Sequence, residues 1–100
     1  MNETTYEERP FIKIPEDIMF SDSLNAYEKS ILMALIYICD EEDNNTCYPT
    51  IKEISIKAKC SESSVHRYLR TLKTKGFLKI KSNFNDDGAQ KPNSYTLNFL

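Results

Sequence analysis

The pattern of apolar and polar residues predicts a central helix in the first half of the chain. Residues 26–40 read AYEKSILMALIYICD, and the second half of this stretch is apolar on every face, as in a helix with neighbours all around it. Asn25 and Glu28 form a capping box that predicts where this helix begins. Before it, FIKIP (11–15) alternates in polarity and ends in a proline, which is typical of a short extended edge segment.

Two further helices are predicted between residues 50 and 76. Thr50 and Glu53 form a second capping box, which opens the helical stretch IKEISIKA. After a turn at Lys59–Cys60, Ser61 is the expected N-cap of a third helix, and Gly76 is the glycine that commonly follows a helix end. The inward positions of the first of these two helices are Ile51, Ile54 and Ala58.

The last quarter of the chain changes to the two-residue period of strands. FLKIKS (77–82) and YTLNFL (95–100) both alternate, and the turn-rich NFNDDGAQKPNS separates them, so the pair predicts a β-hairpin. CYP (47–49) predicts one more short strand, after the charged loop DEEDNNT (40–46). The order is extended segment, helix, short strand, helix, turn, helix, hairpin. It predicts a mainly α fold with a small β wing (α+β): a winged helix-turn-helix with a three-helix core and a C-terminal β-hairpin.

Length and composition indicate one soluble domain. The chain has 100 residues, of which 40% are hydrophobic and 28% charged. MNETTYEERP is polar, so residues 1–10 are predicted to be a flexible acidic N-terminus and residues 11–100 the folded domain. The longest apolar run, Ile31–Cys39, is about half the length of a membrane-spanning helix, and no apolar leader precedes the domain. We therefore expect a cytoplasmic protein with no membrane partner.

Charge is distributed very unevenly along the chain. Residues 1–49 carry three basic and eleven acidic side chains (net −8), and residues 50–81 carry nine basic and two acidic side chains (net +7). Residues 82–100 add one basic and two acidic side chains (net −1). A basic block in an acidic chain favours a polyanionic partner. The alternative is that these basic residues form a solvated face whose charge the acidic half of the protein balances.

The third helix divides into an apolar stripe and a basic face at about 100° per residue. We expect the stripe to pack on the other helices; it comprises Val65, Tyr68, Leu69 and Leu72. The opposite face carries Ser63, Arg67, Arg70 and Thr74, with His66 and Lys73 on one flank. Short hydroxyl side chains allow a helix to approach DNA closely, and arginines reach base edges or phosphates. The third helix is therefore predicted to be a recognition helix (about 61–75) in the major groove of double-stranded DNA.

The motif region resembles a known family. TIKEISIKAKCSESSVHRYLRTLKTKGFLKI (50–80) resembles the helix-turn-helix and wing strand of winged-helix DNA-binding domains, most of all the phage and plasmid group related to replication initiators and replisome-organiser N-terminal domains. FIKIP, LNAYEKSILMALIYI, CYPTIKEIS and KPNSYTL extend the likeness over residues 11–100. Such motifs carry a small residue in the first helix, here Ser55, and commonly a glycine in the turn, where this chain has Lys59. A non-glycine residue with positive φ costs about 1 kcal/mol, so a turn at Lys59 that differs from the common glycine form is one alternative.

The resemblance places the DNA-reading positions at Ser63, Ser64, Arg67 and Arg70 and puts the start of the preceding helix on phosphates. The predicted recognition-helix contacts are Ser61, Ser63, Ser64, His66, Arg67, Arg70, Lys73 and Thr74. The predicted phosphate contacts from the second helix and the wing are Thr50, Lys52, Lys79, Lys81 and Lys91. Asp86 and Asp87 at the wing tip would repel a minor groove, so the wing is expected to hold phosphates rather than to read a groove.

The predicted function is double-stranded DNA binding in plasmid- or phage-type replication initiation. A small transcriptional regulator with the same binding mode is one alternative, and a winged-helix protein-interaction module is another. A homodimer and contacts with further domains or replication proteins are left open.

Other chemistry finds no support in the sequence. Cys39, Cys47 and Cys60 are spaced by 8 and 13 residues, which fits no zinc or disulfide pattern, so we expect reduced, mostly buried thiols. The chain has no glycine-rich phosphate loop, no His/Cys set at metal-ligand spacing and no Ser/His/Asp arrangement. We expect neither an enzyme nor a bound cofactor or metal.

Overall fold

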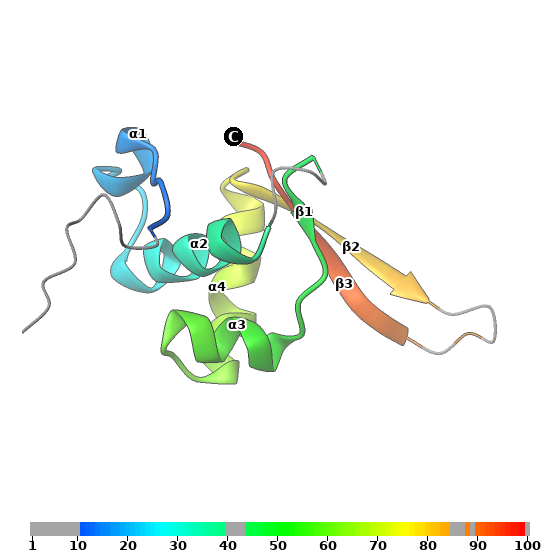
Figure 1. Ribbon diagram of the computed structural model, residues 1–100. Coiled ribbons are helices and arrows are strands. Elements are labelled where there is room, and N and C mark those ends of the chain that lie inside the picture. The colour runs from blue at the N-terminus through cyan, green and yellow to red at the C-terminus, as the bar shows by residue number, and fades with distance from the viewer. Residues whose placement is uncertain (1–10, 40–43, 85–87, 89, 100) are drawn as a thin grey trace, which may run out of the picture.

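The computed structural model describes residues 11–39, 44–84, 88 and 90–99, which form four helices and one antiparallel sheet. The helices are α1 (Glu16–Met19), α2 (Ala26–Ile38), α3 (Ile51–Ala58) and α4 (Glu62–Thr74). The strands are β1 (Thr46–Cys47), β2 (Leu78–Phe84) and β3 (Gln90–Leu97), in the sheet order β1-β3-β2. Figure 1 shows the β2–β3 hairpin projecting from the helical body. The predicted winged helix-turn-helix arrangement is confirmed, with the short α1 in addition.

Side-chain caps start the three longer helices where the sequence predicted them. The Asn25 side chain accepts from the Glu28 amide at 2.8 Å, and the Asn25 amide donates to the Glu28 carboxylate at 2.9 Å. Thr50 and Glu53 form the same reciprocal pair at the start of α3. At α4, Ser61 Oγ accepts from the Ser64 amide at 3.1 Å. Each cap satisfies amide groups that the first turn of a helix leaves without a partner.

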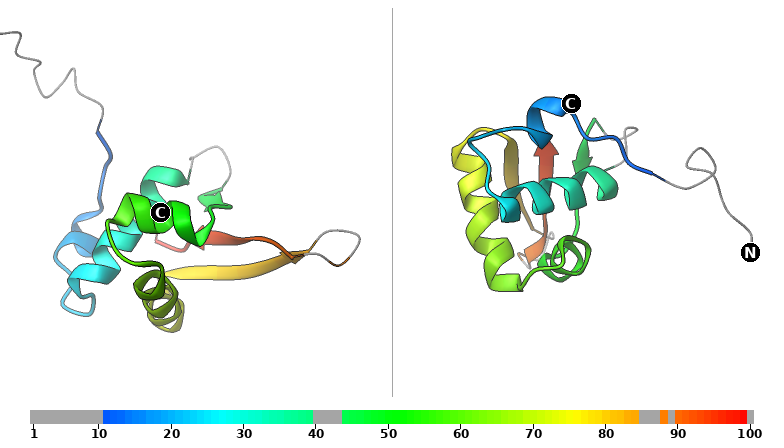
Figure 2. Two further views of the ribbon diagram at one scale, coloured as in Figure 1. Left: turned by 90° about the horizontal axis from the view of Figure 1, so that it is seen from below. Right: turned by 90° about the vertical axis from the view of Figure 1, so that its left-hand side faces the viewer.

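The core lies where α2, α3 and α4 meet and continues onto one face of the sheet. Figure 2 shows α2 lying across α4, with the sheet beyond them. The predicted stripe of α4 is confirmed: Val65, Leu69 and Leu72 are buried, and half-buried Tyr68 packs against the core. On α3, Ile54 and Ala58 are buried as expected, whereas Ile51 is only partly buried. The sheet contributes Leu78, Tyr95 and Leu97.

The extended segments differ from the expectation in two places. Residues 11–15 do not pair with the sheet; the Pro15 carbonyl instead accepts from the amides of Ile18 and Met19 in α1. The hairpin strands extend further toward the tip than predicted. Their backbone pairing continues beyond the part of the hairpin that packs on the core. A register shift between Lys81 and Asn83 places Pro92 at an irregular position of β3, where its missing N–H is tolerated. The predicted flexible N-terminus and the acidic wing tip at Asp86 and Asp87 lie outside the described residues.

Two of the three cysteines form a disulfide, so the expectation of three reduced thiols was wrong for this pair. Cys39 follows the end of α2 and Cys47 ends β1, and pairing of β1 with β3 brings their Cα atoms to 4.8 Å. A spacing of eight residues gave no sign of this, because the approach depends on a strand pairing at the other end of the chain. Cys60 remains a free, half-buried thiol, and burial raises its pKa above the ordinary value.

The turn between α3 and α4 keeps the left-handed form although it lacks a glycine. Lys59 adopts φ 59° and ψ 44°, and the amides of Lys59 and Cys60 both donate to the Ser55 carbonyl. A side chain at this conformation crowds its own backbone, so the turn carries a local strain of about 1 kcal/mol.

Replacing Lys59 with glycine should therefore raise the free energy of unfolding by about 0.5–1 kcal/mol. Denaturant unfolding measures the change. Gly76→Ala is the matched control, because Gly76 has φ 85° and an added Cβ would meet no atom within 4 Å. Its backbone strain alone should lower stability by about 1 kcal/mol. A Lys59→Gly variant less stable than the wild type would contradict this account of the turn.

An ion pair between buried Glu28 and partly exposed Lys75 joins the start of α2 to the end of α4. The Glu28 side chain is 1% exposed and accepts from Lys75 Nζ at 2.8 Å and from Thr71 Oγ1 at 2.6 Å. Lys75 also donates to the Ser23 carbonyl at 2.6 Å. Burial would raise the pKa of Glu28, but the hydrogen bonds from Lys75, Thr71 and Asn25 and the charge of Lys75 outweigh it and hold this pKa below 4.5.

Candidate nucleic-acid interface

A groove of about 450 Å³ runs between α4, the start of α3 and the hairpin. Leu69, Ile80 and Tyr95 form its apolar part. Its polar lining comes from Thr50, His66, Arg70, Lys73, Lys91 and Asn93. We call this feature the α4–hairpin groove. It brings together residues that are up to 46 positions apart in the chain.

The lining of the α4–hairpin groove is basic. Arg70, Lys73 and Lys91 are cationic, His66 is exposed beside them, and the described lining contains no carboxylate. Arg67 and Arg70 both project into solvent, and neither pairs with a carboxylate of the described residues. This is the outward arrangement of the two guanidinium groups on which the prediction of DNA binding depended.

Arg67 lies on the flank of α4 rather than in the groove. Its guanidinium carbon is 5.3 Å from the centre of the Tyr68 ring, which stacks on Tyr27 of α2 with centroids 5.1 Å apart and planes 6° apart. A cation over an aromatic face is held by the ring quadrupole, so Tyr68 limits the directions in which Arg67 extends. The two arginines thus share the exposed side of α4 and differ in their surroundings.

Several of the predicted hydroxyl contacts already take part in hydrogen bonds of the fold. Ser61 Oγ accepts the Ser64 amide and lies 2.9 Å from Ser64 Oγ, and Ser63 Oγ lies 3.2 Å from Ser61 Oγ. Thr74 donates to the Arg70 carbonyl at 3.0 Å, and Thr50 caps α3. These residues line the two helix starts and the exposed face as expected, and their contact with DNA stays a prediction.

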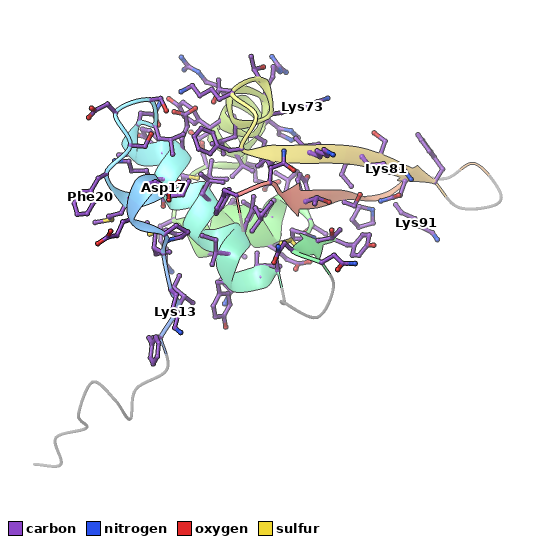
Figure 3. The ribbon with its side chains drawn as sticks, turned by 90° about the horizontal axis from the view of Figure 1, so that it is seen from above. Lys13, Asp17, Phe20, Lys73, Lys81 and Lys91 are labelled. Carbon is purple, nitrogen blue, oxygen red and sulfur yellow. A yellow bond between two sulfur atoms is a disulfide. The ribbon has the colours of Figure 1, made fainter. Side chains whose placement is uncertain are left out.

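The predicted phosphate contacts on the wing separate into two groups. Lys91 lines the α4–hairpin groove, whereas Lys79 and Lys81 alternate with Leu78 and Ile80 and therefore point to the opposite face of the sheet. Figure 3 labels Lys73 on α4 and Lys81 and Lys91 on the hairpin. Lys52 is exposed on α3 outside the groove. The structure thus gathers His66, Arg70, Lys73, Lys91 and Thr50, and leaves Lys52, Lys79 and Lys81 apart.

Asn93 and Tyr95 are groove residues that the sequence reasoning missed. Asn93 Oδ1 is buried and has no hydrogen-bond partner among the described residues, so it is a free acceptor at the groove wall. Burial raises the pKa of Tyr95 above its ordinary value of 10.0. Asn93 fell in a segment expected to be loop, because residues 90–94 (QKPNS) show no alternation of apolar and polar side chains.

The described residues offer neither a metal site nor a membrane-spanning helix. The described residues contain no group of three or more His, Cys, Asp or Glu side chains that could hold a metal ion. Within the same part of the chain, each helix is too short or too polar to cross a membrane.

The fold is that of a winged-helix domain with a basic groove between its helices and its wing. The family model of the DnaD N-terminal domain matches residues 22–100, and the chain belongs to this family. The fold is also similar to the solved structure of a Rep–DNA complex, with a TM-score of 0.57 and 18% sequence identity over 97% of this chain and 84% of that chain. A search of curated proteins found no match. The expected resemblance to replication initiators and replisome organisers is confirmed.

Proposed function

We propose that the domain binds double-stranded DNA during replication initiation, with α4 in the major groove and without catalysis. The observation that carries the proposal is the α4–hairpin groove, where Arg70, Lys73 and Lys91 converge and the described lining has no acid. Membership in the DnaD N-terminal domain family and the similarity to a Rep protein in complex with DNA support it.

The described side chains suggest a division of contacts. Arg67 and Arg70 extend from the exposed side of α4, and arginine is the side chain that most often contacts guanine edges in a major groove. Lys73 and Lys91, on opposite walls of the groove, suit a phosphate backbone that passes between helix and hairpin. Lys52, in the first turn of α3, is exposed and lies where the amides of a helix start add positive potential.

The salt dependence of duplex binding tests the proposal. Each phosphate that a lysine or arginine neutralises contributes about −0.9 to the slope of log K against log salt. Three such phosphate contacts, from Lys73, Lys91 and Lys52, predict a slope of about −3. Fluorescence anisotropy with a mixed-sequence duplex at several salt concentrations measures it. A slope near zero, or no binding at low salt, would exclude the proposal and favour a protein-interaction module.

A further inference from the structure

A second hollow lies on the outer part of the hairpin, next to the α4–hairpin groove. It measures about 390 Å³ and is lined by Tyr48, Asn83, Phe84, Lys91 and Pro92. We call it the wing hollow. Lys91 and Pro92 line both the wing hollow and the α4–hairpin groove, so the two share a wall. A strand held in the groove therefore has a direct path into the wing hollow.

The wing hollow presents two aromatic rings to solvent. Tyr48 and Phe84 are each 60% exposed. The described ring–ring contacts are Tyr27 with Tyr68 and Phe77 with Phe99, so Tyr48 and Phe84 do not stack on each other and their faces stay open. Neither ring belongs to the core, although large aromatic side chains normally gain by burial. A role in binding would explain why these two rings are exposed beside a basic groove.

The backbone holds the hollow in shape. Asn83 Nδ2 donates to the Pro92 carbonyl at 3.2 Å, across the register irregularity of the hairpin. Phe84 follows Asn83 on β2, and Tyr48 follows β1 directly, so β3 lies between the strands that present the two rings. Phe84 is therefore mounted on paired backbone, and Tyr48 directly follows a paired strand.

The combination of aromatic faces and a lysine matches one kind of ligand in DNA. Bases stack on aromatic side chains largely irrespective of sequence, and a nearby cation holds the phosphate of the same nucleotide. A base inside a duplex has both faces covered by its neighbours, whereas an unpaired base has a face to offer. Lys91 is the cation that the hollow shares with the duplex-binding groove.

We propose that the wing hollow binds an unpaired base of DNA, stacked on Tyr48 or Phe84 with its phosphate at Lys91. The proposal rests on the proposed duplex binding and extends it. The domain then recognises a junction, with the duplex along α4 and the first unpaired nucleotides along the outer hairpin. This would direct it to DNA that is already partly opened.

A comparison of blunt and overhanging duplexes tests the proposal. The probes are a duplex of about 20 base pairs and the same duplex with a single-stranded extension of about five nucleotides on either strand, with 2-aminopurine at the first unpaired position. We expect the wild type to bind one of the extended duplexes about tenfold more tightly than the blunt one, with quenching of 2-aminopurine by stacking. The Tyr48→Ser, Phe84→Ser double variant should lose this preference and the quenching and keep its affinity for the blunt duplex within about twofold.

Phe20→Ser is the matched control, because Phe20 is 73% exposed at the end of α1, on the side of the molecule away from the hairpin (Figure 3). It should leave the junction preference unchanged. Equal affinity of the wild type for blunt and extended duplexes would overturn the wing hollow as a base site and leave duplex binding intact. A preference that survives in the double variant would overturn it as well. Failure of the wild type to bind the blunt duplex would overturn the proposed function itself.

Discussion

Alanine at both Arg67 and Arg70 is expected to weaken duplex binding by at least about 2 kcal/mol, or roughly 30-fold, since an arginine that reads a base contributes about 1–3 kcal/mol. Both side chains are exposed on α4, and neither pairs with a carboxylate of the described residues. Their removal therefore takes contacts from the DNA rather than from the fold. Anisotropy titrations at fixed salt measure the loss, and thermal unfolding should show little change because both positions face solvent.

The Lys79→Ala, Lys81→Ala double variant is the matched control for charge. It also removes two cations, but from the face of the sheet opposite Leu78 and Ile80. We expect it to weaken binding less than the arginine double variant does, through the long-range potential alone. Equal losses for the two double variants would mean that net charge, and not the exposed face of α4, governs binding.

Replacing Glu28 with glutamine is expected to lower the free energy of unfolding by about 1.5–3 kcal/mol, the range for hydrogen bonds to a charged group. The carboxylate is 1% exposed and accepts from Lys75, Thr71 and the Asn25 amide, so it ties the end of α4 to the start of α2. Glutamine has one acceptor oxygen in place of two and no charge to offer Lys75. Lys75 is 37% exposed and regains water, so the loss stays below that of a fully buried pair.

The stability that Glu28 adds should depend on pH in a definite direction. Its pKa in the folded protein lies below 4.5, so the folded state favours the ionised form. The contribution is complete at neutral pH and is lost as pH falls from about 4.5 through the lowered folded value. The stability difference between wild type and Glu28→Gln, from denaturant unfolding, should therefore shrink on acidification. Glu62→Gln on the exposed start of α4 is the control; a pH-independent Glu28→Gln difference would contradict the pairing.

Features set by near neighbours could be predicted from the sequence. The three caps at Asn25, Thr50 and Ser61 depend on residues three positions away, and the structure has all of them. The stripe that buries Val65 and Leu72 follows from the helical period alone. The outward face of α4 follows in the same way, which is why the sequence alone predicts that Arg67 and Arg70 face solvent.

Features that depend on distant pairing could not be predicted in this way. The disulfide of Cys39 and Cys47 forms because β1 pairs with β3, and the groove position of Asn93 follows from a register irregularity in β3. The three candidate lysines of the wing are alike in the sequence, but strand alternation sends Lys79 and Lys81 to one face while Lys91 joins the groove. Side-chain type identified the candidates, and only the fold could sort them.

The position of β3 in the middle of the sheet has a consequence for recognition. It pairs with β1 on one side and β2 on the other, and its Tyr95 and Leu97 are anchored among the helices. The base of the hairpin therefore has no hinge about which to swing, and the spacing between helix and wing is set before any ligand arrives. Binding of a ligand between α4 and the wing therefore costs the protein little conformational entropy. Selectivity then depends on whether the shape of the ligand already fits this fixed spacing.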